Sequence, residues 1–208
     1  MKKYFLWVLT AALSAVLAGP VWAADKAVVL GIQGAPMLVR GGQTMPISKG
    51  MEFQKDDVIQ TSQNCMADLS MNNLAGCRVL PASQIAIADA EKGGMRLKIE
   101  SGNAVFNLEK LPKDSTFEVE TPTAVAAVRG TQFWGRVAMD PAASPVTTFA
   151  VRQGSVQIFA KAAQKSFLIQ KGEALDIPAD ASKTPSVRPA LEGEMQAMTQ
   201  ADTIHTAA

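Results

Sequence analysis

Short stretches in which apolar and polar residues alternate one by one run through most of this sequence, and they constrain the fold more than any other feature. Residues 95–100 place three apolar side chains on one face and three charges on the other, and residues 116–120, 156–158 and 174–177 repeat the alternation. Successive side chains of a β-strand point to opposite sides. The pattern therefore predicts half-buried strands from residue 26 to residue 177.

Glycines punctuate these stretches. Each of six alternating segments is preceded by a glycine, namely Gly34, Gly76, Gly94, Gly102, Gly154 and Gly172. Glycine accepts the positive φ that many chain reversals need. Because the spacings are irregular, a strict repeat is not expected. We predict an all-β domain in which many short, mostly antiparallel strands form a twisted sandwich or an irregular β-solenoid.

The N-terminal residues have the pattern of an export signal. Two lysines precede an apolar run over residues 4–17, and the tripeptide at 21–23 places small residues at the two positions that a signal peptidase reads. We expect a secretory signal peptide over residues 1–23, cleaved between Ala23 and Ala24, and a periplasmic location. An uncleaved membrane anchor is the alternative, because the run approaches the length that a bilayer requires. A Gly-Pro pair interrupts the run and favours cleavage.

Composition excludes several classes of function. The chain has 20 Lys and Arg against 19 Asp and Glu, so its formal charge of +1 offers no field to hold a nucleic acid. The single histidine, His205, leaves little for imidazole chemistry or a zinc site. Phosphate-binding loops and nucleophile elbows are missing from the sequence. We expect neither a cofactor nor a metal, and we expect that the protein is not an enzyme.

The two cysteines agree with export. Cys65 and Cys77 would meet an oxidising environment, where an even number of cysteines is compatible with a disulfide. A plain hairpin centred near residue 73 would, however, place Cys77 opposite a residue near Ser70, and a disulfide needs Cα atoms within about 7 Å. The sequence leaves two alternatives open, one disulfide or two separate buried thiols.

The C-terminal part departs from the strand pattern. We expect the β domain to span residues 24–177, followed by a linker and tail over residues 178–208. The linker is inferred from its many Pro, Ala and Ser residues. Beyond it, Leu191, Met195 and Met198 have helical spacing and predict one short amphipathic helix. A frayed or disordered tail is the alternative.

One segment, TPTAVAAVRGTQFW at 121–134, combines several special residues. Its proline fixes an extended start, small apolar residues follow, and then a charge and a flexible glycine interrupt the apolar run. The residues that we expect to shape it are Thr121, Pro122, Arg129, Gly130, Thr131 and Phe133.

Arg129 is the one residue of this segment that would need a charged partner if it were buried. A charge between apolar neighbours must be paired if it is buried. We expect Asp56 or Asp57 to be its partner, which would connect two strands. Binding of an anion by Arg129 is the alternative. The next aromatic residue, Trp134, is a candidate ligand or partner surface, with a place in the core as its alternative.

The segment TPTAVAAVRGTQF resembles the hallmark of the FecR domain family, a TP-x-A-x-x-x-VRGT-x-F stretch late in a β-rich periplasmic domain. The resemblance extends over about residues 26–177, and it implies an all-β fold and a part in extracytoplasmic sensing or protein interaction. The FecR namesakes regulate sigma factors from the inner membrane in response to iron uptake. Only three residues precede the apolar run here, so we expect no cytoplasmic anti-sigma region and a stand-alone secreted domain.

These observations favour a non-enzymatic periplasmic domain that binds an envelope protein in sensing or signalling. We expect no nucleic-acid partner and no stable membrane insertion after the signal is cleaved. The alternative function is a glycan or small-ligand binding module, which would use Trp134 and the loop at 139–145. A hydrolase that uses acidic residues alone is a third reading; Glu118 and Glu120 lie two residues apart on one strand face, where solvated surface residues are expected.

Overall fold

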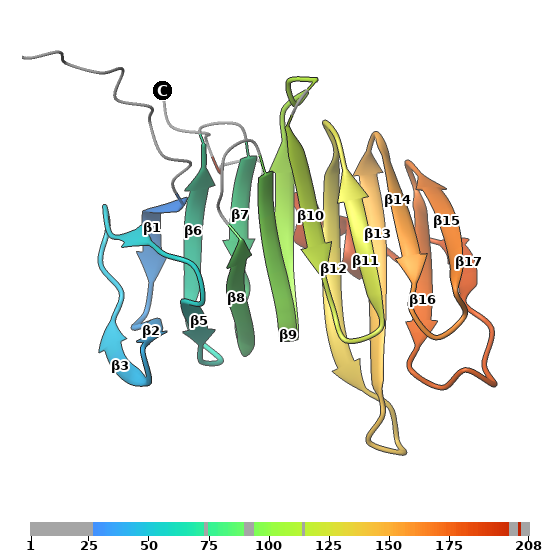
Figure 1. Cartoon of the computed structure of the whole chain (residues 1–208), viewed down its shortest axis with the longest axis horizontal. Coiled ribbons are helices and arrows are strands. Elements are labelled where there is room, and N and C mark those ends of the chain that lie inside the picture. The colour runs from blue at the N-terminus through green and yellow to red at the C-terminus, as the bar shows by residue number, and fades with distance from the viewer. Residues whose placement is uncertain (1–26, 73–74, 90–93, 114, 200–203, 205–208) are drawn as a thin grey trace, which may run out of the picture.

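The computed structural model describes residues 27–72, 75–89, 94–113, 115–199 and 204 (Figure 1). Within them the chain forms seventeen strands and one short helix, α1 (Glu192–Thr199). The predicted all-β class with a short C-terminal helix is therefore confirmed. The signal peptide expected at 1–23 lies outside the described residues. No helix in the described part of the chain is long and apolar enough to span a bilayer.

The strands form two sheets. Sheet A has the spatial order β4 (Glu52–Phe53), β1 (Ala27–Gln33), β6 (Met66–Met71), β7 (Ala75–Val79), the second half of β9 (Gly94–Leu108), β12 (Gln132–Met139), β13 (Pro145–Gln153), β16 (Glu173–Pro178) and β17 (Ser186–Pro189). Sheet B has the order β3 (Gln43–Pro46), β2 (Met37–Arg40), β5 (Val58–Thr61), β8 (Ser83–Asp89), the first half of β9, β10 (Thr116–Glu120), β11 (Ala124–Val128), β14 (Ser155–Ala160) and β15 (Lys165–Gln170).

Successive hairpins alternate between the sheets, so the chain winds around one core. The hairpin β10–β11 belongs to sheet B, β12–β13 to sheet A, β14–β15 to sheet B and β16–β17 to sheet A. Among the pairings in the described residues only β9–β10 is parallel. This arrangement joins the sandwich and solenoid characters that the sequence predicts. The four alternating segments at 95–100, 116–120, 156–158 and 174–177 are all strands.

β9 belongs to both sheets and bends between them. Its first half pairs with β8 and β10 in sheet B, and its second half pairs with β7 and β12 in sheet A. Gly102 lies at the crossing with a φ of +79°, which an L side chain rarely adopts. A Cβ at this position would overlap Ser83 and the carbonyl oxygen of Ala82. Glycine is therefore required at the bend.

Apolar side chains fill the space between the sheets. Phe106 of β9 stacks on Phe133 of β12 with 4.8 Å between ring centroids, and it meets Phe117 of β10 edge-on at 6.0 Å. Each of these three rings is buried. Because β10 belongs to sheet B and β12 to sheet A, the aromatic cluster holds the two sheets together.

The C-terminal segment differs from the expected linker. Residues 186–189 form β17, which extends sheet A beside β16, so the sheet continues beyond the boundary expected at 177. The predicted helix is confirmed as α1, and it packs on the outer face of sheet A with Met198 fully buried. A second apolar cluster lies beneath it, formed by Leu80, Val105, Trp134, Ala150, Ala174, Met198 and Ile204.

Candidate interaction surface

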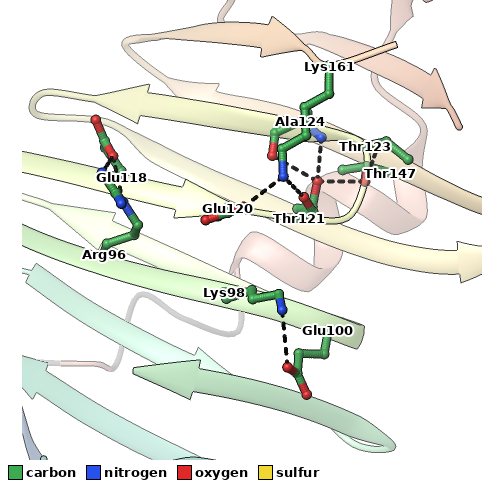
Figure 2. A network of polar contacts seen from close by, with 10 residues as sticks. All are labelled: Arg96, Lys98, Glu100, Glu118, Glu120, Thr121, Thr123, Ala124, Thr147 and Lys161. Carbon is green, nitrogen blue, oxygen red and sulfur yellow. Dashed lines mark hydrogen bonds and ion pairs between the residues drawn. The ribbon is translucent and has the colours of Figure 1, made fainter. Parts of the chain in front are cut away.

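The first half of the TP-to-VRGT segment is a turn that connects the sheets through hydroxyl groups (Figure 2). The main-chain N–H of Ala124 donates to the Thr121 hydroxyl at 2.9 Å, which closes the turn between β10 and β11. The Thr147 hydroxyl on β13 donates to Thr121 at 2.9 Å, and the Thr123 hydroxyl donates to Thr147 at 2.6 Å. The three threonines are buried. They therefore join a turn of sheet B to a strand of sheet A.

Lys161 covers the same turn on its solvent side. Its ammonium group donates to the Glu120 carboxylate and to the Thr121 carbonyl, each at 2.7 Å. Glu118, two residues earlier, pairs with Arg96 at 2.7 Å. Both glutamates thus lie in partly exposed ion pairs, as expected for solvated surface residues. The Glu118 hydrogen bond raises the pKa of the Arg96 guanidinium, so the pair stays charged.

The second half of the segment is also largely structural. Gly130 has a φ of +78°, and a Cβ there would lie 3.2 Å from the Cα of Lys110. The buried Thr131 hydroxyl donates to the Ser155 carbonyl at 2.9 Å. Phe133 belongs to the aromatic cluster of the core. Of the residues expected to shape the segment, Pro122 and Arg129 are the exposed ones.

The predicted pair between Arg129 and Asp56 or Asp57 is wrong. Arg129 is exposed, and its guanidinium donates a hydrogen bond of 3.5 Å to the Leu111 carbonyl and forms no ion pair with another described residue. Asp57 lies on β5's side of sheet B, with β8, β9 and β10 between it and β11. Asp56 is exposed in a turn with a φ of +68°.

Asp57 pairs instead with Arg40, a residue that the sequence reasoning missed. The Arg40 guanidinium donates to the two carboxylate oxygens at 2.8 Å and 2.5 Å, and the N–H of Gln54 adds a third bond at 2.7 Å. The carboxylate is 1% exposed. The available signal was the position of Arg40 at the end of an alternating segment, directly before a Gly-Gly turn.

Arg129 borders two hollows at one end of the sandwich. A groove of about 380 Å³ is lined by Phe117, Ala127, Arg129, Gln157, Leu168 and their neighbours. A hollow of about 510 Å³ on the other side is lined by Leu108, Glu109, Lys110, Arg129, Gly130 and Gln153. The guanidinium therefore stands between two concave surfaces. We call the groove beside Leu168 the Arg129 groove.

The Arg129 groove is lined by cations and apolar groups, and its one carboxylate, Glu118, is paired with Arg96. Lys113 lines the groove and Lys110 lines the adjoining hollow, and neither forms an ion pair with another described residue. The accessible apolar part is formed by Ala127 and Leu168, because the Phe117 ring lies in the core. Such a surface can accept an acidic group beside an apolar one.

The structure contradicts a ligand surface at Trp134. The indole is 6% exposed and lies in the apolar cluster beneath α1. Its N–H donates to the Asn103 side-chain oxygen at 3.1 Å, which satisfies its only donor. Trp134 is therefore a core residue of the outer face of sheet A, the alternative that the sequence left open.

The disulfide is contradicted too. Both cysteines are free and buried. Cys77 lies on β7 opposite Leu69. Cys65 precedes Leu69 by four residues, which places it roughly 13 Å from that position at the rise of an extended chain. Burial strongly raises the pKa of the Cys77 thiol, whereas hydrogen bonds from Ser62 and from the N–H of Ala35 lower the pKa of Cys65. The described residues hold no cluster of three or more His, Cys, Asp or Glu side chains suited to a metal.

Together these features define a two-sheet, all-β domain in which most of the special segment serves the fold, while Arg129 is its one exposed charge. The family model described as FecR protein matches residues 57–157, so the chain contains a FecR domain. The match runs from β5 to the first half of β14 and includes the whole TP-to-VRGT segment. A comparison with curated proteins finds no match.

Solved structures show the same fold. Two crystal structures of a proposed anti-sigma factor from Parabacteroides distasonis ATCC 8503 each align with a TM-score of 0.57 at 14% sequence identity, and the aligned region covers 69% of this chain and 64% of that chain. The match thus spans less than two thirds of that protein. At this identity the likeness shows a shared fold.

Proposed function

We propose that this domain is a non-enzymatic, periplasmic protein-binding module of envelope signalling, and that its partner binds at the Arg129 groove. The observation that carries the proposal is the exposure of Arg129 within a segment whose threonines, glycine and phenylalanine serve the fold. The FecR domain and the fold shared with a proposed anti-sigma factor support a role in signalling. The signal-like N-terminus supports export.

The chemistry of the groove favours a protein partner. Arginine binds carboxylates through two parallel hydrogen bonds and also stacks on planar groups, and it is enriched among the residues that dominate protein interfaces. Apolar contacts with Ala127 and Leu168 would lie beside that anchor. The glycan alternative would use Trp134 and the loop at 139–145, but Trp134 is buried beneath α1.

The test uses a photo-cross-linking amino acid placed in intact cells at Gln157, an exposed residue that lines the groove. We expect one discrete adduct with an envelope protein, and we expect its loss in an Arg129→Glu background. A cross-linker at Thr44, on β3 at the far end of sheet B, should give no such adduct. The captured protein is then purified and its affinity measured.

The matched control is Arg136→Glu, since Arg136 is also exposed but lies on β12 in sheet A. Arg129→Glu should weaken binding at least tenfold, which corresponds to about 1.4 kcal/mol, and Arg136→Glu should change it little. Equal effects of the two variants would contradict the groove as the site. Turnover of a defined substrate by the purified protein would contradict the non-enzymatic role.

A further inference from the structure

Four strands end the two sheets, and three of these edges carry features that prevent pairing with another chain. β4 has two residues, β3 ends in Pro46 and β17 ends in Pro189. Short strands and prolines are the usual protection of a sheet edge. β15, at the right end of Figure 1, has six residues and no proline. Among these four terminal strands it is the one without such protection.

The backbone of β15 offers free hydrogen-bonding groups. Gln170 lies opposite Ser155 of β14, yet its N–H donates away from β14 to the Glu173 carboxylate at 2.8 Å. Bonding alternates along an antiparallel pair, so Ser166 and Leu168 also direct their N–H and C=O groups away from β14. No other described backbone group bonds to these two residues.

Exposed apolar side chains accompany this edge. Leu168 is 59% exposed and Phe159 of β14 is 39% exposed. Leu168 lies opposite Gln157, so Phe159 is its diagonal neighbour on the outer face of sheet B. Large apolar groups gathered beside unpaired backbone groups mark a surface that another strand can cover.

We propose that β15 pairs with β15 of a second copy of this chain, antiparallel across a two-fold axis at Phe167. In this register Ser166 lies opposite Leu168 of the partner subunit, and each strand uses its two free residues. The bond between Gln170 and Glu173 is kept. The axis is normal to sheet B, which continues from one copy into the other.

Self-complementarity selects a second copy over an unrelated strand. In this register the Leu168 side chains of the two copies become diagonal neighbours, so they join the two Phe159 side chains in one apolar strip. On the inner face Phe167, partly buried against the core, meets its own copy as a cross-strand aromatic pair. A patch that satisfies itself in this way is the property of an isologous dimer.

The test measures the mass of the purified protein in solution by sedimentation over a range of concentrations. Ser166→Pro removes an N–H that β14 does not use, so the fold should persist while the dimer is lost. The matched control is Thr44→Pro on β3. Arg40 and Gln43 close the two-residue turn there, so the N–H of Thr44 faces the opposite free edge of sheet B.

We expect a dimer for the wild type and for Thr44→Pro, and a monomer with unchanged circular dichroism for Ser166→Pro. A wild type that stays monomeric at every soluble concentration overturns the proposal. This holds even if a strand of another protein is found to pair with β15. A Ser166→Pro protein that dimerises like the wild type also overturns it.

Cysteine cross-linking checks the register independently of the proline variant. Phe167→Cys faces itself across the axis with about 4.5–5.5 Å between Cβ atoms, as in non-hydrogen-bonded cross-strand pairs. Mild oxidation should therefore link the two chains. Ser166→Cys, which lies opposite Leu168, should give little product. Absence of the Phe167→Cys product, or equal yields from the two variants, contradicts the register.

Discussion

At the scale of single residues, the position of a charge relative to the core decides what its loss costs. Asp57 is almost completely buried and is held by Arg40, whereas Arg129 is exposed and holds one main-chain carbonyl. Breaking a buried ion pair leaves an uncompensated charge in the core, whereas an exposed charge without a partner is solvated by water. The same substitution should therefore destabilise the protein strongly at Arg40 and hardly at all at Arg129.

We expect Arg40→Ala to lower the free energy of unfolding by about 2–4 kcal/mol, toward the low end of buried pairs because the Arg40 side chain is partly exposed. Arg129→Ala should stay within about 0.5 kcal/mol of the wild type, as is usual for surface substitutions. Urea unfolding of both variants measures the difference. A large loss of stability in Arg129→Ala would show that the arginine serves the fold.

The thiols give a second prediction at this scale. The unreduced, denatured protein should contain two free thiols. In the native protein Cys65 should react with an alkylating reagent before Cys77, because Ser62 lowers the pKa of Cys65 and burial raises that of Cys77. Ser62→Ala should shift the pH profile of Cys65 alkylation upward. Detection of no free thiol would restore the disulfide.

The special segment shows how far single residues can be predicted from sequence. Gly130 and Phe133 were recognised because a positive φ and a large apolar group have local signals. The partner of Arg129 was not predicted correctly, because it depends on strand order. Three strands of sheet B separate Asp57 from β11, and no pattern within either segment encodes that number.

At the scale of elements, α1 is held on sheet A by one arginine together with an apolar cluster. Arg188 on β17 pairs with Asp176 of β16 at 2.6 Å and with Glu194 of α1 at 2.7 Å. Glu194 also accepts the N–H of Leu191 at 2.7 Å. The helix has only eight residues, and such a length is not stable alone in water. Its position on sheet A therefore depends on this ion pair and on the burial of Met198.

Arg188→Ala should release α1 from sheet A. The cluster around Trp134 would then meet water, so Trp134 fluorescence should shift to longer wavelength while the β-sheet signal in circular dichroism persists. The measurement uses the protein without residues 1–23, in which Trp134 is the only tryptophan. Arg96→Ala is the matched control, because the Arg96–Glu118 pair is more exposed and contributes about 0–1 kcal/mol. An unshifted spectrum in Arg188→Ala would show that apolar contacts alone hold the helix.

Elements with a local sequence pattern were predicted well, whereas β17, which forms a strand only beside β16, was not. Alternation within 95–100 or 116–120 is visible without knowledge of the fold, and so is the helical spacing of Leu191, Met195 and Met198. β17 lies between prolines and becomes a strand because β16 offers it a free edge. Its Pro-rich composition indicates a linker because proline has no N–H to donate to a neighbouring strand, and the same lack protects the sheet edge.

At the scale of the whole molecule, the two sheets share one chain segment and one aromatic cluster. β9 pairs with β8 and β10 on one side of its bend and with β7 and β12 on the other. A dimer through β15 would extend sheet B without disturbing this centre. The two-fold axis normal to the sheet would place both Arg129 grooves on the same face, where two copies of a partner could bind.

The bend of β9 at Gly102 is the point on which both sheets depend, and a pair of glycines with the same φ tests it. Gly102 and Gly42 both have a φ of +79°, but a Cβ at Gly42 meets nothing within 4 Å, whereas one at Gly102 overlaps the main chain of Ala82 and Ser83. Gly42→Ala should therefore cost only the strain of the left-handed region, about 1–2 kcal/mol.

Gly102→Ala adds the displacement of packed backbone, so its cost should reach about 2–5 kcal/mol. The displaced atoms lie where the turn at Ala82 meets the start of β8. The Ser83 hydroxyl there accepts the N–H of Asn103 at 2.8 Å and donates to the Asn103 carbonyl at 3.0 Å. Thermal and urea unfolding of both variants measures the difference. If the two variants lost equal stability, the strain would reside in φ alone, and the crossing of β9 between the sheets would tolerate a side chain.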